Sequence, residues 1–207
     1  MTLGVQEVDL SVPDICDAVQ GLQLEDRYIP IQYKGKFAFG NVCTVEFIDK
    51  QSKDIGVKGG YIDKVYGIPV LSGIEGNGAY CGSMIANHFK GNILVNGYIR
   101  DIDEMNNTIG IGYKGVRGYG NSMYYKIKQI GYPMEIKTNM GYFTITSDDM
   151  VFMDQHGAIF IERKHLNKVF DYIQQRKAID LKIEQLLLLG LPWYLAVQQR
   201  HQLKSKL

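Results

Sequence analysis

The sequence has little cysteine: its 207 residues include only Cys16, Cys43 and Cys81. They are far apart, and no Cys-x-x-Cys spacing occurs, so the sequence indicates neither a zinc clip nor a redox-active pair. An odd number of separated cysteines is most simply explained by reduced thiols in a reducing compartment. We therefore expect a cytoplasmic protein.

Long hydrophobic runs and an excess of either charge are also missing. The most apolar stretch, residues 186–191, is far too short to cross a bilayer. The N-terminal residues include Glu7 and Asp9 and no apolar signal-peptide core. The net charge is +1 with both signs mixed along the chain, so the concentrated basic face used for nucleic-acid binding is absent. We expect neither a membrane nor a nucleic acid as partner.

The sequence motifs of two common kinds of site, the nucleotide-phosphate loop and the histidine metal site, are absent. Residues 76–78 read Gly-Asn-Gly, but no Gly-Lys-Ser/Thr follows, which favours a tight turn over a nucleotide-phosphate loop. The four histidines, His88, His156, His165 and His201, do not stand at metal-ligand spacings. We expect surface or capping roles for them, with His156 the first exception to test because it lies between two predicted strands.

What the sequence does contain is typical of one globular α/β domain. Hydrophobic residues make up 45% and charged residues 22%, enough for a sizeable core. A short apolar strand at 68–71 is followed by a glycine-rich segment, a helix over 79–89 and a strand from Ile93. This order of strand, glycine loop, helix and strand is typical of α/β architecture.

Other elements are predicted from periodicity and from capping residues. Ser11 is a good N-cap for a helix over residues 11–21. Alternation predicts a strand over 37–47, with a bulge at Gly40-Asn41. Further predictions are a short strand at 109–113, a loop at 114–120, a hairpin of 134–137 with 141–145, strands at 150–154 and 158–161, a helix after Glu162 that ends near residues 190–192, and a tail from Trp193 that forms a short helix or packs elsewhere.

The most informative segment is 93–101, an apolar run that ends in Gly97 and is followed by Arg100-Asp101. The arginine offers a planar fork of donors that fits a carboxylate. The aspartate offers oxygens that suit a hard cation such as magnesium. Side by side they would hold an α-keto acid and a divalent metal. The alternative is a simple salt bridge at a strand end, which is common and contributes little to stability.

Three other groups of residues each have two possible roles. Arg117 would reach a second substrate carboxylate or lie solvated in its loop. Cys81 stands beside the glycine-rich turn, but no base is near it in sequence, so packing is the simpler role. Tyr119, Tyr124 and Tyr125 would line a pocket or an interface.

Four segments, in order, resemble the RraA-like family, which contains the regulator of ribonuclease E activity A and the class II 4-hydroxy-4-methyl-2-oxoglutarate aldolases. The most specific is residues 97–103, Gly-Tyr-Ile-Arg-Asp-Ile-Asp, which is similar to the family's Gly-x-Val-Arg-Asp-x-Asp signature. It lies in the third segment, which comprises residues 79–86 and 93–103. The other three segments, residues 11–21, 39–45 and 148–161, are weaker and support it by their order. The match spans roughly residues 11–190.

The resemblance implies the fold and the assembly. We expect an α/β fold, an RraA-like swivelling β/β/α domain with C-terminal helices, assembled as a homotrimeric ring with a site between subunits. The single domain would span residues 1–207, with 162–207 as a helical C-terminal extension.

The resemblance also implies roles for individual residues. Arg100 would bind the pyruvate-like part of the substrate, and Asp101 would hold Mg²⁺ or another divalent cation, mostly through water. The backbone N–H groups of Gly82, Ser83, Met84 and Ile85 would bind the keto-acid carboxylate.

One departure from the family pattern bears on function. The family's turn usually carries an acid where this chain has Ser83, and Glu75 is the candidate to supply the missing carboxylate. The ribonuclease regulators lose the aspartate after the arginine, whereas this chain keeps Asp101.

We expect a metal-dependent carbon–carbon lyase that acts on an α-keto acid, by retro-aldol release of pyruvate or by decarboxylation of an oxaloacetate-like acid. The alternatives are a non-catalytic oligomeric regulator and a redirected enzyme of specialised metabolism.

Overall fold

The computed structural model describes residues 10–32, 37–57, 60, 62–74, 78–89, 92–105, 115–120, 124–138 and 141–205. The chain forms two compact units. One unit comprises residues 27–163 and holds the strands, and the other is formed by the helical segments that precede and follow it in the sequence. Glu75 and the predicted strand at 109–113 lie outside the described residues.

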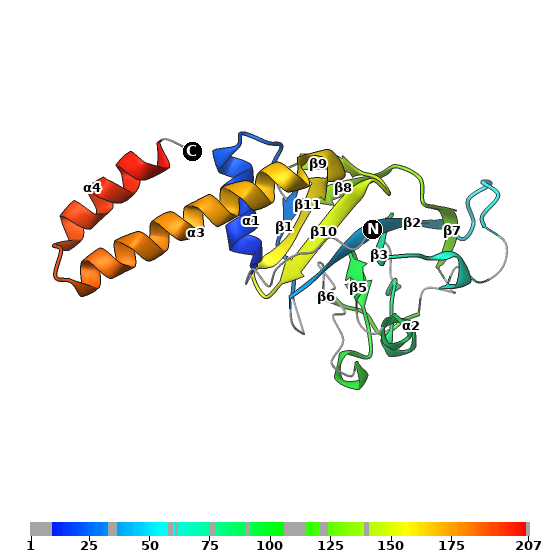
Figure 1. Ribbon diagram of the computed structural model, residues 1–207. Coiled ribbons are helices and arrows are strands. Elements are labelled where there is room, and N and C mark those ends of the chain that lie inside the picture. The colour runs from blue at the N-terminus through cyan, green and yellow to red at the C-terminus, as the bar shows by residue number, and fades with distance from the viewer. Residues whose placement is uncertain are drawn as a thin grey trace. The chain divides into compact units, whose positions relative to one another are not determined.

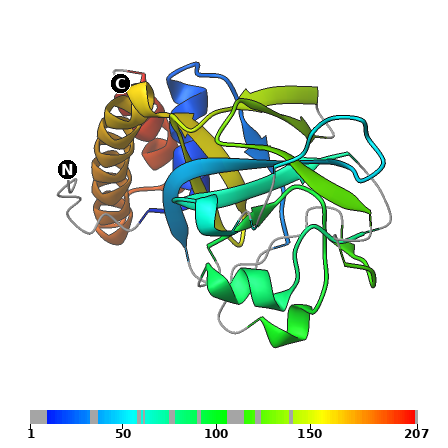
Figure 2. The ribbon, with the colours of Figure 1, turned by 90° about the vertical axis from the view of Figure 1, so that its right-hand side faces the viewer.

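The strand-rich unit is built on a mixed sheet. Within the described residues this sheet has seven strands in the order β1-β11-β10-β2-β3-β4, and β7 also pairs with β2. The bounds are β1 Tyr28–Ile29, β2 Ala38–Asp49, β3 Ile68–Gly73, β4 Leu94–Val95, β7 Tyr125–Ile130, β10 Asp149–Asp154 and β11 Gly157–Glu162. The long, curved β2 is antiparallel to β10 at its start and parallel to β3 further on, so it joins the two halves of the sheet (Figure 2).

Short elements complete this unit. Helix α2 (Ser83–His88) follows the glycine-rich segment, and β5 (Tyr98–Ile99) pairs in parallel with β6 (Gly115–Val116). A 3₁₀ turn, η2 (Ile102–Glu104), follows β5, and a second one, η1 (Ile62–Lys64), precedes β3. The hairpin of β8 (Met134–Thr138) and β9 (Gly141–Ile145) is present as predicted.

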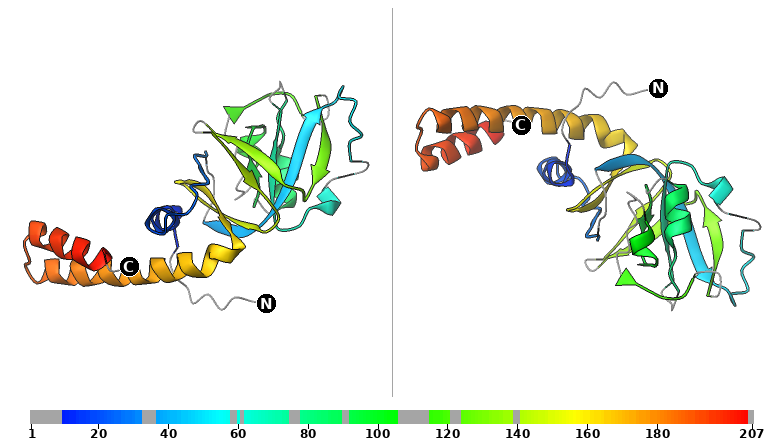
Figure 3. Two further views of the ribbon diagram at one scale, coloured as in Figure 1. Left: turned by 90° about the horizontal axis from the view of Figure 1, so that it is seen from above. Right: turned by 90° about the horizontal axis from the view of Figure 1, so that it is seen from below.

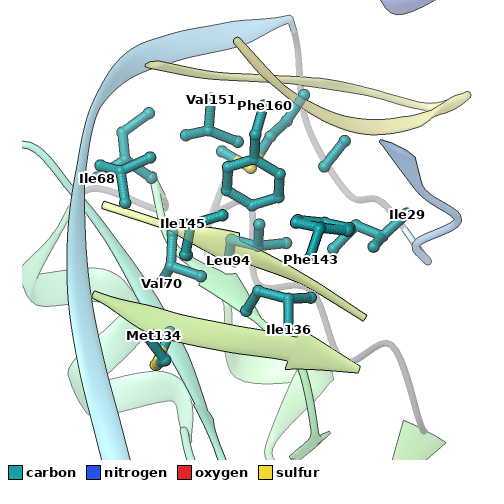
Figure 4. Close-up of a cluster of buried hydrophobic side chains, with 13 residues drawn as sticks. Ile29, Ile68, Val70, Leu94, Met134, Ile136, Phe143, Ile145, Val151 and Phe160 are labelled. Atoms are coloured by element: carbon teal, nitrogen blue, oxygen red, sulfur yellow. The ribbon is translucent and has the colours of Figure 1, made fainter. Parts of the chain in front are cut away.

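The hairpin covers one hydrophobic core (Figure 4). Met134 and Ile136 of β8 are buried, whereas Glu135 and Lys137 between them are exposed, which is the alternation that a half-buried strand requires. Their partners come mainly from β3, β9, β10 and β11 and include Val70, Phe143, Ile145, Val151 and Phe160. Each fully buried large side chain stabilises the fold by about 1.5–3 kcal/mol.

A second core lies around β4, β5 and α2. It includes Val45, Phe47, Leu71, Tyr80, Ala86, Ile93, Val95, Ile99 and Met105. The rings of Phe47 and Tyr80 stack with centroids 4.7 Å apart. This core fixes the end of β5, and therefore the backbone that leads into Arg100.

The helical unit contains α1 (Val12–Gly21), α3 (Leu166–Leu188) and α4 (Trp193–Lys204). The Oγ of Ser11 accepts a hydrogen bond from the backbone N–H of Asp14, so the predicted N-cap is confirmed. Helix α3 ends before Gly190, which has a φ of +89°, and α4 returns alongside it (Figure 3). The Arg200 guanidinium donates to Asp180 at 2.6 and 3.0 Å and links the two helices. No helix within the described residues is long and apolar enough to cross a membrane.

Three local predictions are corrected. The predicted helix over 79–89 is shorter, because Gly78 and Cys81 form parallel bridges with Tyr119 and Ile99 and keep the chain extended up to Gly82. The predicted bulge at Gly40-Asn41 is wrong: both residues pair regularly with β10, and the irregularity lies between Glu46 and Phe47. Strand β7 was not predicted, although residues 125–128 at its start alternate apolar and polar side chains.

Candidate functional site

Arg100 and Asp101 follow directly after β5. The backbone N–H of Arg100 donates to the carbonyl of Cys81 at 3.0 Å, which places the pair beside the glycine-rich turn. The Arg100 Nε donates to the Asp101 Oδ2 at 3.0 Å, and the two side chains are 41% and 32% exposed. A pair this exposed contributes at most about 1 kcal/mol to stability. The salt bridge is therefore present, but it adds too little to the stability of the fold to explain why these two residues stand side by side.

Two glycines make room for these side chains. A Cβ on Gly82 would lie 2.7 Å from the Asp101 Oδ2 and 3.3 Å from the Arg100 Nε. A Cβ on Gly120 would lie 3.2 Å from the Arg100 Nη1. The guanidinium therefore lies close to the backbone of two separate segments. The structure brings together the turn and the Arg-Asp pair that the sequence placed in one site.

The turn itself opens helix α2. Gly82 is the N-cap residue and has an extended conformation, and the backbone N–H of Ala86 donates to its carbonyl at 3.1 Å. The first backbone N–H groups of a helix have no acceptor within the helix. Those of Ser83, Met84 and Ile85 are in this position, and Gly82, just before them, lies close to the Arg100 side chain. Such a turn offers an anion both donors and a nearby positive charge.

Glu104 is the residue that sequence reasoning missed. The Oγ of Ser83 donates a hydrogen bond to the Glu104 Oε2 at 3.0 Å. Glu104 closes the η2 turn, and its backbone N–H donates to the Asp101 carbonyl at 3.2 Å. The available signal was the acidic run after Arg100, which puts three carboxylates within four residues.

Other candidate residues have structural partners. The Arg117 Cζ lies 4.1 Å from the centroid of the Tyr98 ring, a cation–π contact at β5. Tyr125 is buried and packs edge-on against Tyr80, with ring centroids 5.0 Å apart. The Nδ1 of His156 lies 3.1 Å from the Asp154 Oδ1, within the tight turn between β10 and β11.

Cys81 is buried beneath the turn and donates weakly to the Gly82 carbonyl at 3.3 Å. Burial, with a smaller contribution from the Asp101 charge, raises the pKa of its thiol to about 12. A thiol with this pKa is protonated at neutral pH and is a poor nucleophile. This favours the packing role over a catalytic one.

The residues present fit a magnesium ion held largely by water. Among the described residues there is no group of three or more histidines, cysteines or acids that could enclose a metal. Mg²⁺ commonly keeps several waters and binds one or two carboxylates together with its substrate. The partly exposed Asp101 carboxylate, beside a turn that suits a carboxylate ligand, matches that donor set.

A cavity of about 470 Å³ lies elsewhere in the strand-rich unit. It is lined by Glu46, Phe47, Ser72, Gly73, Ile74, Asn96, Met134, Glu135, Lys137 and Tyr142. Neither Arg100, Asp101 nor the turn contributes to it.

Solved structures show the same fold at low sequence identity. An uncharacterized protein from Pseudomonas syringae pv. tomato is 18% identical, with a TM-score of 0.72 over 92% of each chain. RraAS2 of Streptomyces coelicolor, described as an unusual member of the RNase ES inhibitor RraA protein family, is 16% identical, with a TM-score of 0.70 over 86% of this chain and 94% of that one. A protein described as a novel cellulase from microbes of the gut ecosystem is 16% identical, with a TM-score of 0.71 over 88% and 90%.

A sequence search of curated proteins finds no match to this chain. A family model does match: the model described as RraA-like, Aldolase/RraA, covers residues 12–160. This match includes the Arg-Asp signature, the turn and most of the sheet. The predicted fold, an α/β RraA-like domain with C-terminal helices, is confirmed. The chain belongs to the RraA-like family, which includes both aldolases and regulators of ribonuclease E.

Proposed function

We propose that this protein is a metal-dependent carbon–carbon lyase that acts on an α-keto acid. The observation that carries the proposal is the close approach of the Arg100 guanidinium and the Asp101 carboxylate to Gly82, at the start of α2. A cation-binding carboxylate, a carboxylate-binding arginine and helix N–H groups then face one small region. An α-keto acid has the complementary groups, a carboxylate and an adjacent keto oxygen.

Arg100 and the N–H groups of the turn would bind the substrate carboxylate and fix its orientation. Asp101 would hold a divalent cation, chiefly through water. When bound, such a cation supplies Lewis-acid polarisation of the keto oxygen. Arg100 adds positive potential where negative charge develops.

The proposed reaction is retro-aldol cleavage or decarboxylation. In the first, a water molecule takes the proton of the substrate's 4-hydroxyl group, the resulting alkoxide becomes the keto group of the departing product, and the electron pair of the C3–C4 bond that breaks forms the enolate of pyruvate. In the second, the bond to the departing carboxylate breaks, carbon dioxide leaves, and the electron pair of that bond forms the enolate. Protonation of the enolate carbon by water completes pyruvate in both cases.

Separable roles for Arg100 and Asp101 provide the test. Arg100→Lys keeps the charge but loses the planar fork, so KM should rise while the fold survives. Asp101→Asn keeps the shape but loses the charge, so magnesium-dependent turnover should fall by about 100-fold or more. Asp103→Asn is the matched control, because Asp103 is exposed in the same turn, and it should stay near wild type.

The assay is pyruvate formation from 4-hydroxy-4-methyl-2-oxoglutarate and loss of oxaloacetate, each with and without Mg²⁺. A wild-type protein without magnesium-dependent activity on either acid would rule out this function for these substrates. If both variants instead unfold, Arg100 and Asp101 form a structural pair.

A non-catalytic regulator is the second candidate. Two observations favour it: Arg100 and Asp101 already satisfy each other at 3.0 Å, and the turn carries Ser83 in place of the acid usual in the family. A regulator would bind neither cation nor keto acid through this pair. Its partner binding would survive Asp101→Asn, whereas the lyase activity would not.

A further inference from the structure

The cavity of about 470 Å³ in the strand-rich unit has polar groups of its own. Three of its lining residues come from neighbouring strands: Glu46 from β2, Ser72 near the end of β3, and Asn96 directly after β4. Strand β3 is parallel to both β2 and β4, and Glu46 is the register partner of Ser72. The carboxyl ends of neighbouring parallel strands are a common place for ligands to bind. The volume lies in the range of small-molecule pockets, about 300–1,000 Å³.

Asn96 has an acceptor atom that no described residue satisfies. The residue is 3% exposed, and its Nδ2 donates to the Ser72 Oγ at 3.1 Å and to the Lys137 carbonyl at 3.5 Å. Its Oδ1 is buried and has no hydrogen-bond partner within the described part of the chain. Turning the amide over would set this oxygen against the Lys137 carbonyl, which can only accept, so the contacts fix the orientation. A buried acceptor destabilises the fold unless a donor reaches it.

Ser72 offers the complementary group at the same place. Its buried hydroxyl accepts the hydrogen bond from Asn96, and its own hydrogen has no acceptor among the residues that the structure describes. A hydroxyl group carries one donor and two acceptor lone pairs. The cavity wall therefore presents a donor and an acceptor on two residues in contact. A hydroxyl group of a ligand, which both donates and accepts, complements this pair.

The charges around the cavity are balanced, which favours a neutral ligand. The Glu46 Oε1 accepts from the Lys128 Nζ at 2.9 Å, and its Oε2 accepts from the Gln129 Nε2 at 2.6 Å. Glu135 and Lys137, which also line the cavity, have opposite signs and stand two residues apart on β8. A charged ligand would face a charge of its own sign beside each opposite charge. Neutral O–H groups, in contrast, can donate to the remaining carboxylate lone pairs.

Apolar and aromatic side chains form the rest of the wall. Phe47 and Met134 are buried, whereas Ile74 and Tyr142 are 42% and 62% exposed. The face of an aromatic ring is electron-rich, so it attracts the C–H groups on the face of a sugar or cyclic polyol ring. A few polar groups set among apolar and aromatic walls is the usual composition of a small-molecule site.

We propose that this cavity binds a neutral polyhydroxylated molecule of the size of a monosaccharide or cyclic polyol, with the Asn96 Oδ1 and the Ser72 hydroxyl as its polar anchors. This binding site goes beyond the proposed lyase function and does not depend on it. The alternative is a cavity that holds only water. A water molecule, whose share of liquid volume is about 30 Å³, would bridge Asn96 and Ser72 without selecting any solute.

The experiment is saturation-transfer difference NMR on the full-length protein with four neutral probes: D-glucose, D-galactose, D-xylose and myo-inositol. At least one of them should bind with a Kd of about 1 mM or tighter. D-Glucosamine and D-glucuronate place a positive or a negative charge on the glucose ring. Both should bind more weakly than the best neutral probe by about tenfold or more, because a buried charge needs a counter-charge.

Variants assign the binding to this cavity. Tyr142→Ala should weaken binding of the best probe by about fivefold or more, because the aromatic contact is lost. Tyr132→Ala is the matched control: Tyr132 is also 62% exposed but does not line the cavity, so affinity should stay at the wild-type value. Ser72→Ala should weaken binding by about tenfold, because the ligand hydroxyl loses its donor. Arg100→Lys should bind the probe as the wild type does, because Arg100 does not line the cavity.

The melting temperature is measured for each variant. Tyr142 is exposed on β9, so Tyr142→Ala still tests the site if Ser72→Ala fails to fold. No signal from any of the four neutral probes would identify a water-filled cavity and overturn the proposal. Equal losses in Tyr142→Ala and Tyr132→Ala, or a loss in Arg100→Lys, would place the probe elsewhere and overturn it too. Tighter binding of either charged sugar would contradict the neutral class.

Discussion

At the scale of single residues, the backbone of Asp101 shapes the candidate site. Its φ of 57° and ψ of 39° place it in the left-handed region, which it shares with Gln23 among the described non-glycine residues. Aspartate tolerates this conformation better than most residues do. The sharp turn lets η2 fold back, so that Glu104 faces Ser83.

Cys81 leads to a prediction about pH. Burial raises the pKa of its thiol from 9.0 to about 12, so the folded state favours the protonated form. The resulting contribution to stability is complete below about pH 9 and is lost as the pH rises towards 12. The midpoint of urea unfolding should fall over this range, and less steeply in Cys81→Ala.

The burial of Cys81 also predicts that its thiol is alkylated slowly in the folded protein. At pH 8, iodoacetamide should modify the half-buried Cys16 in the folded protein and leave Cys81 unmodified, as detected by mass spectrometry. In denaturant, both should react. Rapid modification of native Cys81 would contradict the packing role.

At the scale of elements, a buried ion pair connects the residue before β1 to the first residue of β10. The Arg27 Nη1 and Nη2 donate to the two Asp149 oxygens at 2.8 Å each, and Nη2 also donates to the Thr144 carbonyl. Asp149 accepts in addition from the backbone N–H of Thr146 at 2.7 Å. Both charged side chains are at most 5% exposed. The pair therefore fixes how three strands meet.

Removing one charged partner of this ion pair should destabilise the fold, because the other charge stays buried without its counter-charge. Asp149→Ala should lower the free energy of unfolding by about 3–5 kcal/mol, measured by urea denaturation. The control is Asp148→Ala: Asp148 is its exposed neighbour, and the change should stay within about 0.5 kcal/mol. Equal effects of the two substitutions would show that the buried pair is not specifically required.

At the scale of the whole molecule, the helical unit exposes large apolar side chains where α3 gives way to α4. Leu188, Leu189, Trp193 and Tyr194 are 83%, 85%, 72% and 65% exposed. Clustered apolar exposure of this kind marks association surfaces. It supports the expectation that the chain associates with further copies of itself, as in the predicted homotrimer.

Light scattering tests this assembly. At micromolar concentration the mass should be about three times the 23.5 kDa of the chain, or a multiple of that. Leu188→Lys with Leu189→Lys should lower the mass, because burying two added charges opposes association. Ile55→Lys is the control: Ile55 is 88% exposed but belongs to the strand-rich unit. A monomeric mass for the wild-type protein would rule out the homotrimer and, with it, a site between subunits.

The sequence by itself determined the elements whose signals are local. Ser11 caps α1, the alternation around Ile136 and Phe143 makes a hairpin, and Gly190 ends α3, because capping and side-chain periodicity depend on near neighbours. The Arg-Asp signature likewise identified the family and the end of β5. These features need no knowledge of distant contacts.

Only the tertiary structure decided where distant residues meet. Extended pairing with Tyr119 and Ile99 delays the start of α2, and β7 has its place because β2 is long enough to pair with it. The contact between Ser83 and Glu104 depends on the left-handed turn at Asp101 and on a second core that holds α2 beside β5. No periodicity encodes such a contact, because it arises from the packing of segments that the chain brings together only when it folds.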